Sequence, residues 1–524
     1  MPTRPEIRTS GNVTTRGFDP RVDAARPRVL ISAAHKSSGK TTFTTGLAAA
    51  LTARGLVVQT YKKGPDYIDP LWHARATRRP CYNLDFNTQD PAEIEATIAA
   101  HAAGVDFELI EGNKGLHDGV DLEGRDSTAA LAKLVGAPVV LVLDAFGMTR
   151  GIAPLVLGYQ VFDRDVDIRG VVLNRVATAR QEEKLRQALE RYTDLKVLGC
   201  IGRSADLTVA ERHLGLTTPQ ETDNVERVVA HLAETVAADV DVDGVIELAS
   251  RPAHGHRAPT APVVVTTTPS RDVEPVTIGV VRDEAFCFYY QDDLEALEAA
   301  GARLEFFSAL TTPRLPRIDG LFIGGGFPES HIDRLAANAS LRHDIAAAAG
   351  EGLPIYAECG GLMYLSRSIA WKGEKGDMVG VVPADAVVQE RPQGRGLVVM
   401  EETVAMPWPT PRGATKPVRV KAHEFHYARL ENLASGCRFA YRVVRGDGIT
   451  GTDDGIVVGN VMASFTHLRD TSRARWAERF VEFVRARAGD SRSPTASAVE
   501  PAAAARSGRG RSVGAAAVMR GADR

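Results

Sequence analysis

Long apolar runs and paired cysteines are both missing from this 524-residue sequence. No apolar run reaches the roughly 18 residues that a membrane-spanning helix needs, and the polar N-terminus has no apolar centre of the kind found in signal peptides. The five cysteines are odd in number, far apart and in no CxxC pair, which argues against a disulfide framework or a zinc site. We therefore expect a cytoplasmic protein with no membrane segment.

An excess of charge of either sign is also missing. The 63 basic and 66 acidic residues nearly cancel and are interspersed along the chain. This pattern gives no nucleic-acid footprint and no polybasic patch for a membrane surface. Small molecules are therefore the expected partners.

What the sequence does contain is an alternation of short apolar runs with helix-like stretches, which predicts parallel sheets covered by helices. A Pro- and Thr-rich segment then interrupts the pattern before "VTIGVVRD" at 276 starts it again. We predict an α/β protein with two doubly wound domains. The expected divisions are a disordered extension at 1–26, a P-loop domain at 27–250, a linker at 251–275, a second domain at 276–486 and a disordered tail at 487–524.

The stretch "AAHKSSGKTT" follows the apolar run "RVLIS" and opens a helical pattern, which is the context of a phosphate-binding loop. Backbone amides around Gly39 would bind phosphate oxygens, Lys40 would reach the terminal phosphates and the Thr41 hydroxyl would bind Mg²⁺. Thr42 is expected to contribute to the same site. Ala34 stands where the first glycine of the motif is usual, and alanine is tolerable there if its φ stays negative.

Two further loops supply carboxylates at the ends of predicted strands. "KKGPDYIDPLWH" contains Asp66 and Asp69, and "LIEGNKGLHDGVD" contains Glu111 and Asp118. Open parallel sheets bind ligands at the carboxyl ends of their strands, which is where the first loop is expected to lie. Glu111, at the end of its strand, is well placed to hold Mg²⁺ or its water opposite Lys40. Taken alone, the first loop could equally be a capped turn and the second a solvated loop.

In the second domain, "GLPIYAECGGLMYL" places Cys359 between an apolar strand and two glycines that begin a helix. This layout exposes a side chain at the end of a strand and directs backbone amides at it, as a thiol nucleophile requires. The other four cysteines are expected to be inert core thiols. His467 follows a later strand and suits the role of base, while Gly325 and Gly326 in "GGGFPES" could supply oxyanion-binding amides.

The motifs "KGPDYIDP", "NLD", "EGxxGLxDG" and "ERHLGL", in this order behind a P-loop, resemble the cobyrinic acid a,c-diamide synthase family. That family belongs with the dethiobiotin-synthetase-like ATPases. The second half of the chain resembles class I glutamine amidotransferase domains of the cobyric and cobyrinic type. Together the two resemblances cover Arg28 to Val484.

The resemblance implies a reaction in which ATP activates a substrate carboxylate as an acyl phosphate and ammonia released from L-glutamine at Cys359 converts it to an amide. Tyr67 and Ile68 would line the substrate side. His73 and His117 could contact substrate carboxylates, although a surface histidine is the alternative for each. The residues implied to serve ATP and Mg²⁺ are Gly39, Lys40, Thr41, Thr42, Asp66, Glu111 and Asp118, with Thr41, Asp66 and Glu111 as the metal ligands.

The sequence departs from the family at three places. Arg469 occupies the position two residues after the histidine, where class I amidotransferases usually carry a glutamate and the cobyrinic family a second histidine, so what orients His467 is open. Asn113 and Lys114 replace a usual Val-Met pair, and this variant and the P-loop sequence both resemble a branch that amidates sirohaem. The P-loop sequence is the third departure. "HEFHY" at 423 matches the family, and a metal site there is disfavoured because no further ligands accompany its two histidines.

The predicted activity is amidation of the a and c carboxylates of cobyrinate, with ATP, Mg²⁺ and glutamine. Amidation of sirohydrochlorin or sirohaem to siroamide is the alternative, so a tetrapyrrole polycarboxylate is the expected substrate in either case. A partitioning-type regulatory ATPase is a remote alternative, because Lys36 lies one place from the signature lysine of that class and His35 occupies its position. A cysteine hydrolase that uses only the second half is another. Homodimer formation is left open.

Overall fold

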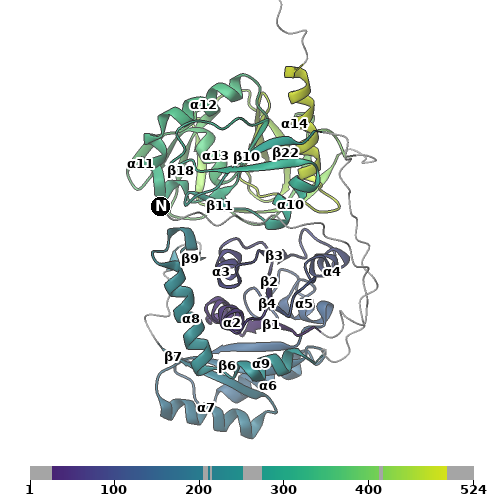
Figure 1. Cartoon of the computed structure of the whole chain (residues 1–524), viewed down its shortest axis with the longest axis vertical. Helices are drawn as coiled ribbons and strands as arrows, with labels where there is room; N and C mark the ends of the chain where they lie inside the picture. Colours follow the sequence, from purple (N-terminus) through teal and green to yellow (C-terminus); the bar gives the residue numbers. More distant parts are fainter. Residues whose placement is uncertain (1–25, 204–210, 213–214, 252–273, 412–416, 493–524) are drawn as a thin grey trace, which may run out of the picture.

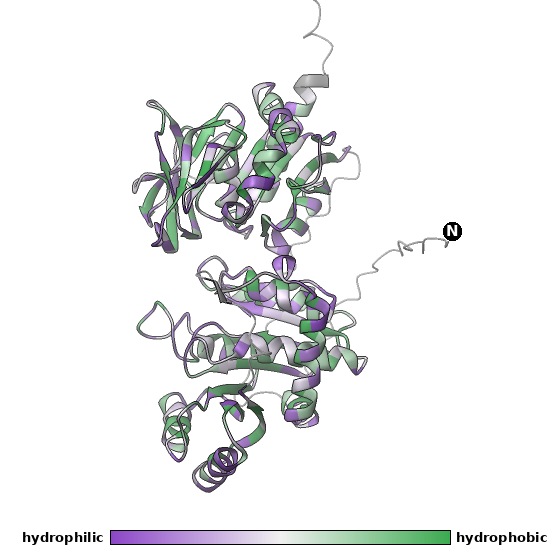
Figure 2. Ribbon diagram, turned by 90° about the vertical axis from the view of Figure 1, so that its left-hand side faces the viewer, coloured by the Kyte–Doolittle hydropathy of each residue, from purple (hydrophilic) through white to green (hydrophobic). Residues whose placement is uncertain are grey.

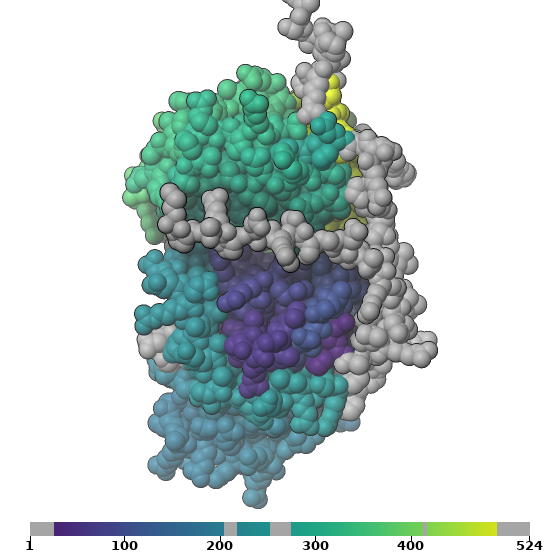
Figure 3. Space-filling model, viewed as in Figure 1, coloured from purple at the N-terminus to yellow at the C-terminus, as the bar shows by residue number. Residues whose placement is uncertain are grey.

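The computed structural model describes residues 26–203, 211–212, 215–251, 274–411 and 417–492. The two halves lie one above the other, with the N-terminal half below the C-terminal half in Figures 1 and 3. Nearly all of the expected N-terminal extension and linker, and the tail beyond Arg492, lie outside the described residues. The last helix continues to Arg492, past the boundary that we expected at residue 486.

The N-terminal half is built on a seven-stranded sheet in the order β3-β2-β4-β1-β5-β6-β7. Every neighbouring pair is parallel. The strands are β1 (Arg28–Ala33), β2 (Val58–Lys63), β3 (Cys81–Leu84), β4 (Phe107–Glu111), β5 (Val139–Asp144), β6 (Ile168–Val176) and β7 (Lys196–Gly202). The short strands β8 (Glu211–Arg212) and β9 (Gly215–Leu216) form a separate pair.

Both faces of this sheet are covered by helices, which makes the half doubly wound. Along β1, Val29 and Ile31 belong to one apolar core and Leu30 to the other, as the alternation of side chains in a strand requires. Helices α2 (Lys40–Ala53), α3 (Ile68–Thr77), α8 (Val225–Asp239) and α9 (Val242–Ala249) contribute to the first core. Helices α4 (Pro91–Ala100), α5 (Thr128–Val135), α6 (Ile152–Phe162) and α7 (Ala179–Tyr192) contribute to the second.

The C-terminal half contains a nine-stranded mixed sheet in the order β12-β10-β13-β15-β24-β23-β22-β19-β20. The first five strands are parallel and the remaining pairs are antiparallel. The strands are β10 (Val276–Val281), β12 (Ala302–Phe307), β13 (Gly320–Ile323), β15 (Ile355–Glu358), β19 (Gly394–Glu402), β20 (Arg419–His426), β22 (Arg438–Arg445), β23 (Asp453–Val458) and β24 (Val461–Ser464).

Smaller elements complete this half. A four-stranded sheet joins β16 (Ser366–Trp371), β17 (Glu374–Asp377), β18 (Val382–Val388) and β21 (Ala428–Glu431), and β11 (Phe286–Phe288) pairs with β14 (Gly325–Gly326). The helices are α10 (Gln291–Ala299), α11 (Ile332–Ala337), α12 (Ala339–Gly350), α13 (Gly360–Leu365) and α14 (Trp476–Arg492). Short 3₁₀ turns lie at η1 (Pro219–Glu221) and η2 (Pro328–His331).

Apolar residues are concentrated in the strands and on the inner faces of the helices, as the green colouring in Figure 2 shows. This distribution follows from the gain in free energy when apolar surface leaves water. In the part of the chain that the structure describes, no helix combines the length and the apolar character needed to cross a membrane.

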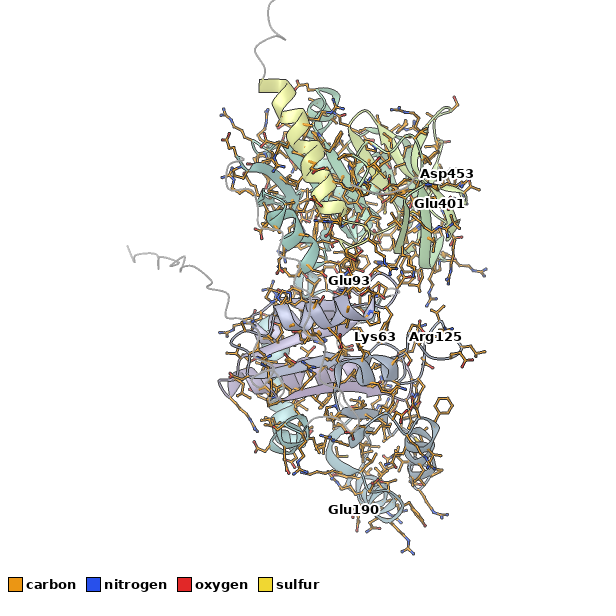
Figure 4. The ribbon with its side chains drawn as sticks, turned by 90° about the vertical axis from the view of Figure 1, so that its right-hand side faces the viewer. Lys63, Glu93, Arg125, Glu190, Glu401 and Asp453 are labelled. Carbon is orange, nitrogen blue, oxygen red and sulfur yellow. The ribbon has the colours of Figure 1, made fainter. Side chains whose placement is uncertain are left out.

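The two halves are in direct contact through side chains on several elements. The ring of Tyr67, just before α3, stacks on the ring of Phe288 in β11 with 5.2 Å between centroids. The Asn87 side chain donates a hydrogen bond of 2.8 Å to the carbonyl oxygen of Ala422. Glu93 lies at the boundary in Figure 4 and accepts a 2.6 Å bond from the amide of Ser472. The sites of the two halves are therefore held next to each other.

Among the contacts between the halves that involve a charged side chain, the one made by Arg469 is the most buried. Its guanidinium donates to the carbonyl oxygen of Asn83 in the N-terminal half and to the carboxylate of Asp292 in α10, and it lies 5.0 Å from the centre of the Tyr290 ring. Only 1% of Arg469 is exposed. A buried cation of this kind requires such partners, because desolvation is costly.

We expect Arg469→Ala to lower the free energy of unfolding by about 3 kcal/mol, because it leaves Asp292 without its buried partner. Arg473→Ala is the control, since Arg473 makes only an exposed interdomain contact of 3.8 Å with Asp90 and its loss should cost less than about 1 kcal/mol. Denaturation followed by circular dichroism measures both. Equal losses in the two variants would contradict the assignment of Arg469 as an interdomain anchor.

Candidate active site

A cavity of about 1440 Å³ lies between the two halves. Its N-terminal wall contains the P-loop, and its C-terminal wall contains His423 and His467. Figure 4 shows Lys63, another lining residue, near the upper edge of the N-terminal half and beneath the C-terminal sheet. The P-loop and the candidate glutaminase base His467 therefore face one space.

The P-loop has the backbone that its sequence predicts. Strand β1 ends at Ala33, helix α2 begins at Lys40, and Gly39 between them has φ of 90°. The positive φ favours glycine at this position, and a Cβ atom there would lie only 2.1 Å from Nδ2 of Asn174 and would have to displace that side chain. Ala34 does not have a positive φ, which is why alanine is accepted at its position. Burial lowers the pKa of Lys40 to about 8.

Glu111, at the end of β4, is fully buried and accepts three hydrogen bonds. Its Oε1 accepts from Thr41 Oγ1 at 2.8 Å and from Lys62 Nζ at 2.9 Å, and its Oε2 lies 2.5 Å from His73 Nε2. Burial alone would raise the pKa of Glu111, but the charge of Lys62 and the hydrogen bond from His73 hold that pKa well below its usual range. Glu111 thus fixes the Thr41 hydroxyl in place as a permanent carboxylate.

Neither sequence-based interpretation of His73 holds. His73 is 0% exposed, so it is not a surface residue, and its two ring nitrogens are occupied by Glu111 and by Thr45 Oγ1 at 3.2 Å. It therefore has no nitrogen free for a substrate carboxylate. His117 is half-buried beside the rings of Tyr159 and Phe162, with centroids 5.4 and 4.8 Å away.

Asp66 and Asp118 both line the cavity. Asp66 accepts the backbone amide of Asp69 at 3.1 Å, and burial together with the charge of Asp69 raises the pKa of Asp66 to about 7. Lys62 Nζ lies 2.5 Å from Asp69 and 3.9 Å from Asp66, so it partly offsets the negative charge. Asp118 accepts the amide of Gly115 at 2.9 Å.

The oxygen atoms at this wall fit a magnesium ion bound together with phosphates. Among the described residues there is no group of three His, Cys, Asp or Glu side chains that could hold a metal by itself. Magnesium is usually held by one or two carboxylates plus phosphate oxygens and water, so a hydroxyl and one carboxylate facing the cavity are sufficient. Thr41 and Asp66 provide these atoms, while Glu111 is buried behind Thr41.

Cys359 lies between β15 and α13 in a backbone conformation that non-glycine residues rarely adopt, with φ of 47° and ψ of −99°. Such strain is typical of a nucleophile held at a sharp turn. The amide of Cys359 donates to the carbonyl oxygen of Ser464 at 2.7 Å, which ties the turn to the end of β24. The residue is 7% exposed.

His467 contacts both Cys359 and the residue before it. Nδ1 of His467 lies 3.4 Å from a carboxylate oxygen of Glu358. Burial lowers the pKa of His467, but the neighbouring thiol of Cys359 and carboxylate of Glu358 outweigh this and raise it to about 10. Glu358 itself accepts a hydrogen bond from the Tyr356 hydroxyl and one of 2.9 Å from the amide of Leu468. His467 therefore lies between the thiol of Cys359 and a carboxylate that is itself held in place by hydrogen bonds.

The motif "HEFHY" lies mainly in β20 and places His423 beside His467. Their rings are stacked with centroids 4.9 Å apart, and the amide of His467 donates to the carbonyl oxygen of His423 at 2.9 Å. Burial and the neighbouring charges of His467 and Arg469 lower the pKa of His423 well below its usual value. His423 is therefore an uncharged wall of the site.

The glycines of β14 approach the same histidine. A Cβ atom at Gly325 would lie 2.6 Å from Cε1 of His467, and one at Gly326, whose φ is 156°, would lie 2.0 Å from the carbonyl oxygen of Ala285. Gly360, the first residue of α13, lies against the amide of Gly326. Because Gly325, Gly326 and Gly360 have no side chains, β14, the start of β11 and the start of α13 can approach one another beside Cys359.

Tyr67 is buried against the C-terminal half, and Ile68 follows it at the start of α3. The Tyr67 ring lies 4.6 Å from the ring of Tyr290 and 5.2 Å from that of His467. Both Tyr67 and Ile68 line the cavity. Tyr67 thus stands between the P-loop wall and the candidate glutaminase base.

Known proteins match both halves. The family model described as a CobB/CobQ-like glutamine amidotransferase domain matches residues 277–474, and an AAA domain model matches residues 27–211. Cobyrinate a,c-diamide synthase of Magnetococcus marinus is 44% identical over 463 residues, which cover 88% of this chain and 98% of the relative. The synthases of Methanosarcina acetivorans and Archaeoglobus fulgidus are 38% and 39% identical, each covering 87% of this chain and 95% and 97% of the relative.

The chain belongs to the cobyrinate a,c-diamide synthase family. The resemblance inferred from the motifs is thereby confirmed, as is the fold class of two α/β domains. As a member of this family with an amidotransferase domain, the protein is a glutamine-dependent carbon-nitrogen ligase. Its P-loop domain and its relatives indicate the use of ATP.

Sequence reasoning missed three residues of this family member's site. Glu358 directly precedes Cys359, and its position beside the nucleophile was a signal that we did not use. Asn174, at the end of β6, donates to the carbonyl oxygen of Ser38 in the P-loop at 2.9 Å. Lys62 was visible in "KKGPDYIDP", but its contacts with Asp69 and Glu111 depend on the pairing of β2 with β4.

We expect Gly325→Ala to reduce glutamine hydrolysis about 100-fold, because the new methyl group would push the His467 ring away from its position beside Cys359. Gly350→Ala is the control, since nothing lies within 4 Å of a Cβ atom at that position. Release of glutamate from glutamine measures both, and thermal denaturation checks folding. Full glutaminase activity in a folded Gly325→Ala protein would contradict this account of the site.

Proposed function

We propose that this protein uses ATP and glutamine to convert two carboxylates of a cobyrinate-type tetrapyrrole into amides. The supporting observation is the shared cavity, whose walls carry the P-loop on one side and His467 on the other. Ammonia formed at the amidotransferase domain would thus be released into the space where the activated carboxylate lies. The relatives at 44% to 38% identity are named for cobyrinate, which makes it the first candidate substrate.

In the glutaminase half-reaction, the thiolate of Cys359 attacks the side-chain amide carbon of glutamine. The amides of Gly325 and Gly326 are the candidate donors for the oxyanion, because the amide of Cys359 already donates to Ser464. His467 gives a proton to the departing ammonia, and water then hydrolyses the glutamyl thioester to glutamate. The thiol is regenerated for the next turnover.

Glu358 takes the orienting role that the sequence left open at Arg469. Its carboxylate is fixed by Tyr356 and by the amide of Leu468, and it faces Nδ1 of His467 at 3.4 Å. A carboxylate in this position holds the imidazole in one orientation and stabilises its protonated form, as the third member of a catalytic triad does. Arg469 has a different task, because it anchors the same loop to the N-terminal half.

The ligase half-reaction starts on the P-loop wall. Gly39, Lys40 and Thr42 would bind the phosphates of ATP, and Thr41, Asp66 and Glu111 would position a magnesium ion that neutralises phosphate charge, with Glu111 acting through Thr41. A substrate carboxylate oxygen attacks the γ-phosphorus, giving an acyl phosphate and ADP. Ammonia then attacks the acyl carbon, and inorganic phosphate departs with the C–O bond electrons. Asp118 is a further candidate for the phosphate side.

Ammonia has a short route between the two half-reactions. Tyr67 and Ile68 line the same cavity as the P-loop, and the Tyr67 ring also lies beside the ring of His467. Its neighbours Phe288, Tyr290 and neutral His423 are aromatic and uncharged. These rings thus give this part of the route an aromatic surface without a formal charge.

Sirohydrochlorin or sirohaem is the second candidate substrate. Asn113 and Lys114, which differ from the usual family pair, both line the cavity, so their chemistry bears directly on what the cavity accepts. A partitioning-type ATPase or an isolated cysteine hydrolase explains only one wall of the cavity. Both are disfavoured for that reason.

Two substitutions test the division of labour. We expect Cys359→Ala to abolish amidation driven by glutamine and to spare amidation driven by ammonium salts, because only the ammonia source is lost. Lys40→Ala should abolish amidation from either nitrogen source while part of the glutaminase activity remains. Mass spectrometry of the tetrapyrrole and release of glutamate provide the measurements.

The same assay compares cobyrinate with sirohydrochlorin and sirohaem as acceptors in the unmodified enzyme. Mass gain with cobyrinate supports the first candidate, and turnover of sirohydrochlorin or sirohaem alone would replace it with the second. Full hydrolysis of glutamine by Lys40→Ala would instead favour the cysteine hydrolase, which uses only the second half of the chain.

We expect Glu358→Gln to lower the glutaminase kcat at least about tenfold and to move the alkaline limb of its pH profile to lower pH. Glu358 raises the pKa of His467, so removal of its charge lets the imidazolium lose its proton at a lower pH. Ammonium-driven amidation should be unchanged. Glu351→Gln, at an exposed position in the same half, is the control. An unshifted alkaline limb would refute the orienting role.

A further inference from the structure

The cavity wall formed by the C-terminal half carries three basic residues on adjacent strands. Arg395 belongs to β19, Lys421 to β20 and Arg445 ends β22, and all three line the cavity. Val399 pairs with Lys421 on one side and with Arg445 on the other, so the last two lie in one row across the sheet. We call Arg395, Lys421 and Arg445 the basic wall.

These residues share one face of the sheet because side chains alternate along a strand. The intervening residues Val398, Met400, Val420 and Ala422 point to the other face and are at most 4% exposed, in the core of the C-terminal half. On the cavity face, Leu397 and Phe425 lie beside Arg395 and are only half-buried. The wall is thus an apolar surface bordered by positive charges.

The charges of the basic wall are not neutralised by the protein. Within the described parts of the chain, no acidic side chain forms an ion pair with Arg395, Lys421 or Arg445, and Arg395 contacts only the ring of Phe425, at 5.4 Å. Farther along the same face, Arg419 and Arg442 each pair with Glu401. Figure 4 shows Glu401 on this sheet, away from the boundary with the N-terminal half. Only the cationic groups beside the cavity are thus left for a ligand.

The size of the cavity leaves room for a ligand at this wall in addition to ATP. Pockets for a single small molecule usually measure about 300–1,000 Å³, and this one measures about 1440 Å³. The P-loop would bind phosphate groups at the opposite wall. The rest of the cavity, with its apolar surface and positive charges, suits a second anion with an extended apolar body.

We propose that the basic wall binds the carboxylates of the tetrapyrrole that are not being amidated, with the macrocycle lying on Leu397 and Phe425. This inference rests on the proposed function. The amidotransferase domain then forms half of the acceptor site as well as supplying ammonia. Because guanidinium groups pair with carboxylates in a fixed geometry, the wall would determine which carboxylate reaches the P-loop.

The test uses Lys421→Ala and Arg445→Ala in the full-length protein, with Arg419→Ala as the matched control. Arg419 lies on the same strand and face as Lys421, but it is paired with Glu401 and does not line the cavity. With ammonium chloride as nitrogen donor, we expect the KM for the tetrapyrrole to rise about tenfold in each cavity variant. The KM for ATP and the rate of glutamine hydrolysis should stay at the level of the unmodified enzyme.

Equilibrium binding of cobyrinate, followed by its absorbance without ATP, separates this inference from the proposed function. Weaker binding by the cavity variants but not by Arg419→Ala supports the basic wall even if no amide is formed, in which case the proposed function fails alone. Unchanged binding and KM in the two cavity variants would overturn the inference while leaving amidation in place. An equal loss in Arg419→Ala would also overturn it, because the effect would then be one of general charge.

Discussion

The contact of the Tyr67 ring with the aromatic groups of the C-terminal half is the interaction on which the arrangement of both sites depends. Tyr67 belongs to the loop that also carries Asp66, and it stacks on Phe288 while touching the ring of His467. Burial of these rings stabilises the contact between the two halves, and this stabilisation would be lost if water separated them. The aromatic contacts of Tyr67, together with the hydrogen bonds of Asn87, Glu93 and Arg469, thus set the separation between the phosphate-binding loop and the glutaminase base. The cavity is the space left between them.

Two buried carboxylates organise the chemistry on either side of this contact. Glu111 is held as an anion by Lys62 and His73 and fixes Thr41, and Glu358 is fixed by Tyr356 and faces His467. In each case a carboxylate at the end of a parallel strand positions a neighbouring group that faces the reactants. The desolvation of both charges is compensated by hydrogen bonds that require a rigid sheet.

The local parts of this picture could be predicted from sequence, and the parts that depend on pairing between distant strands could not. Gly39, Lys40 and Thr41 carry their geometry within one turn, so the P-loop was recognisable. The strain at Cys359 follows from its immediate neighbours in the same way. His73 was misjudged because its burial against Glu111 requires α3 to pack on β2 and β3 so that His73 reaches the end of β4, and helix α3 has no strong apolar face that would reveal this. The match of the basic wall to the P-loop depends on how the halves dock.

Arg469 also connects the two sites to each other through hydrogen bonds that involve Asn83. The carbonyl oxygen of Asn83 accepts from Arg469, and the side chain of Asn83 donates to the carbonyl oxygens of Gly64 and Asp66. Asp66 lines the nucleotide side of the cavity, and Arg469 is two residues from His467. The loop that carries Asp66 on the nucleotide side and the loop that carries the glutaminase base His467 are therefore joined by hydrogen bonds that meet at Asn83.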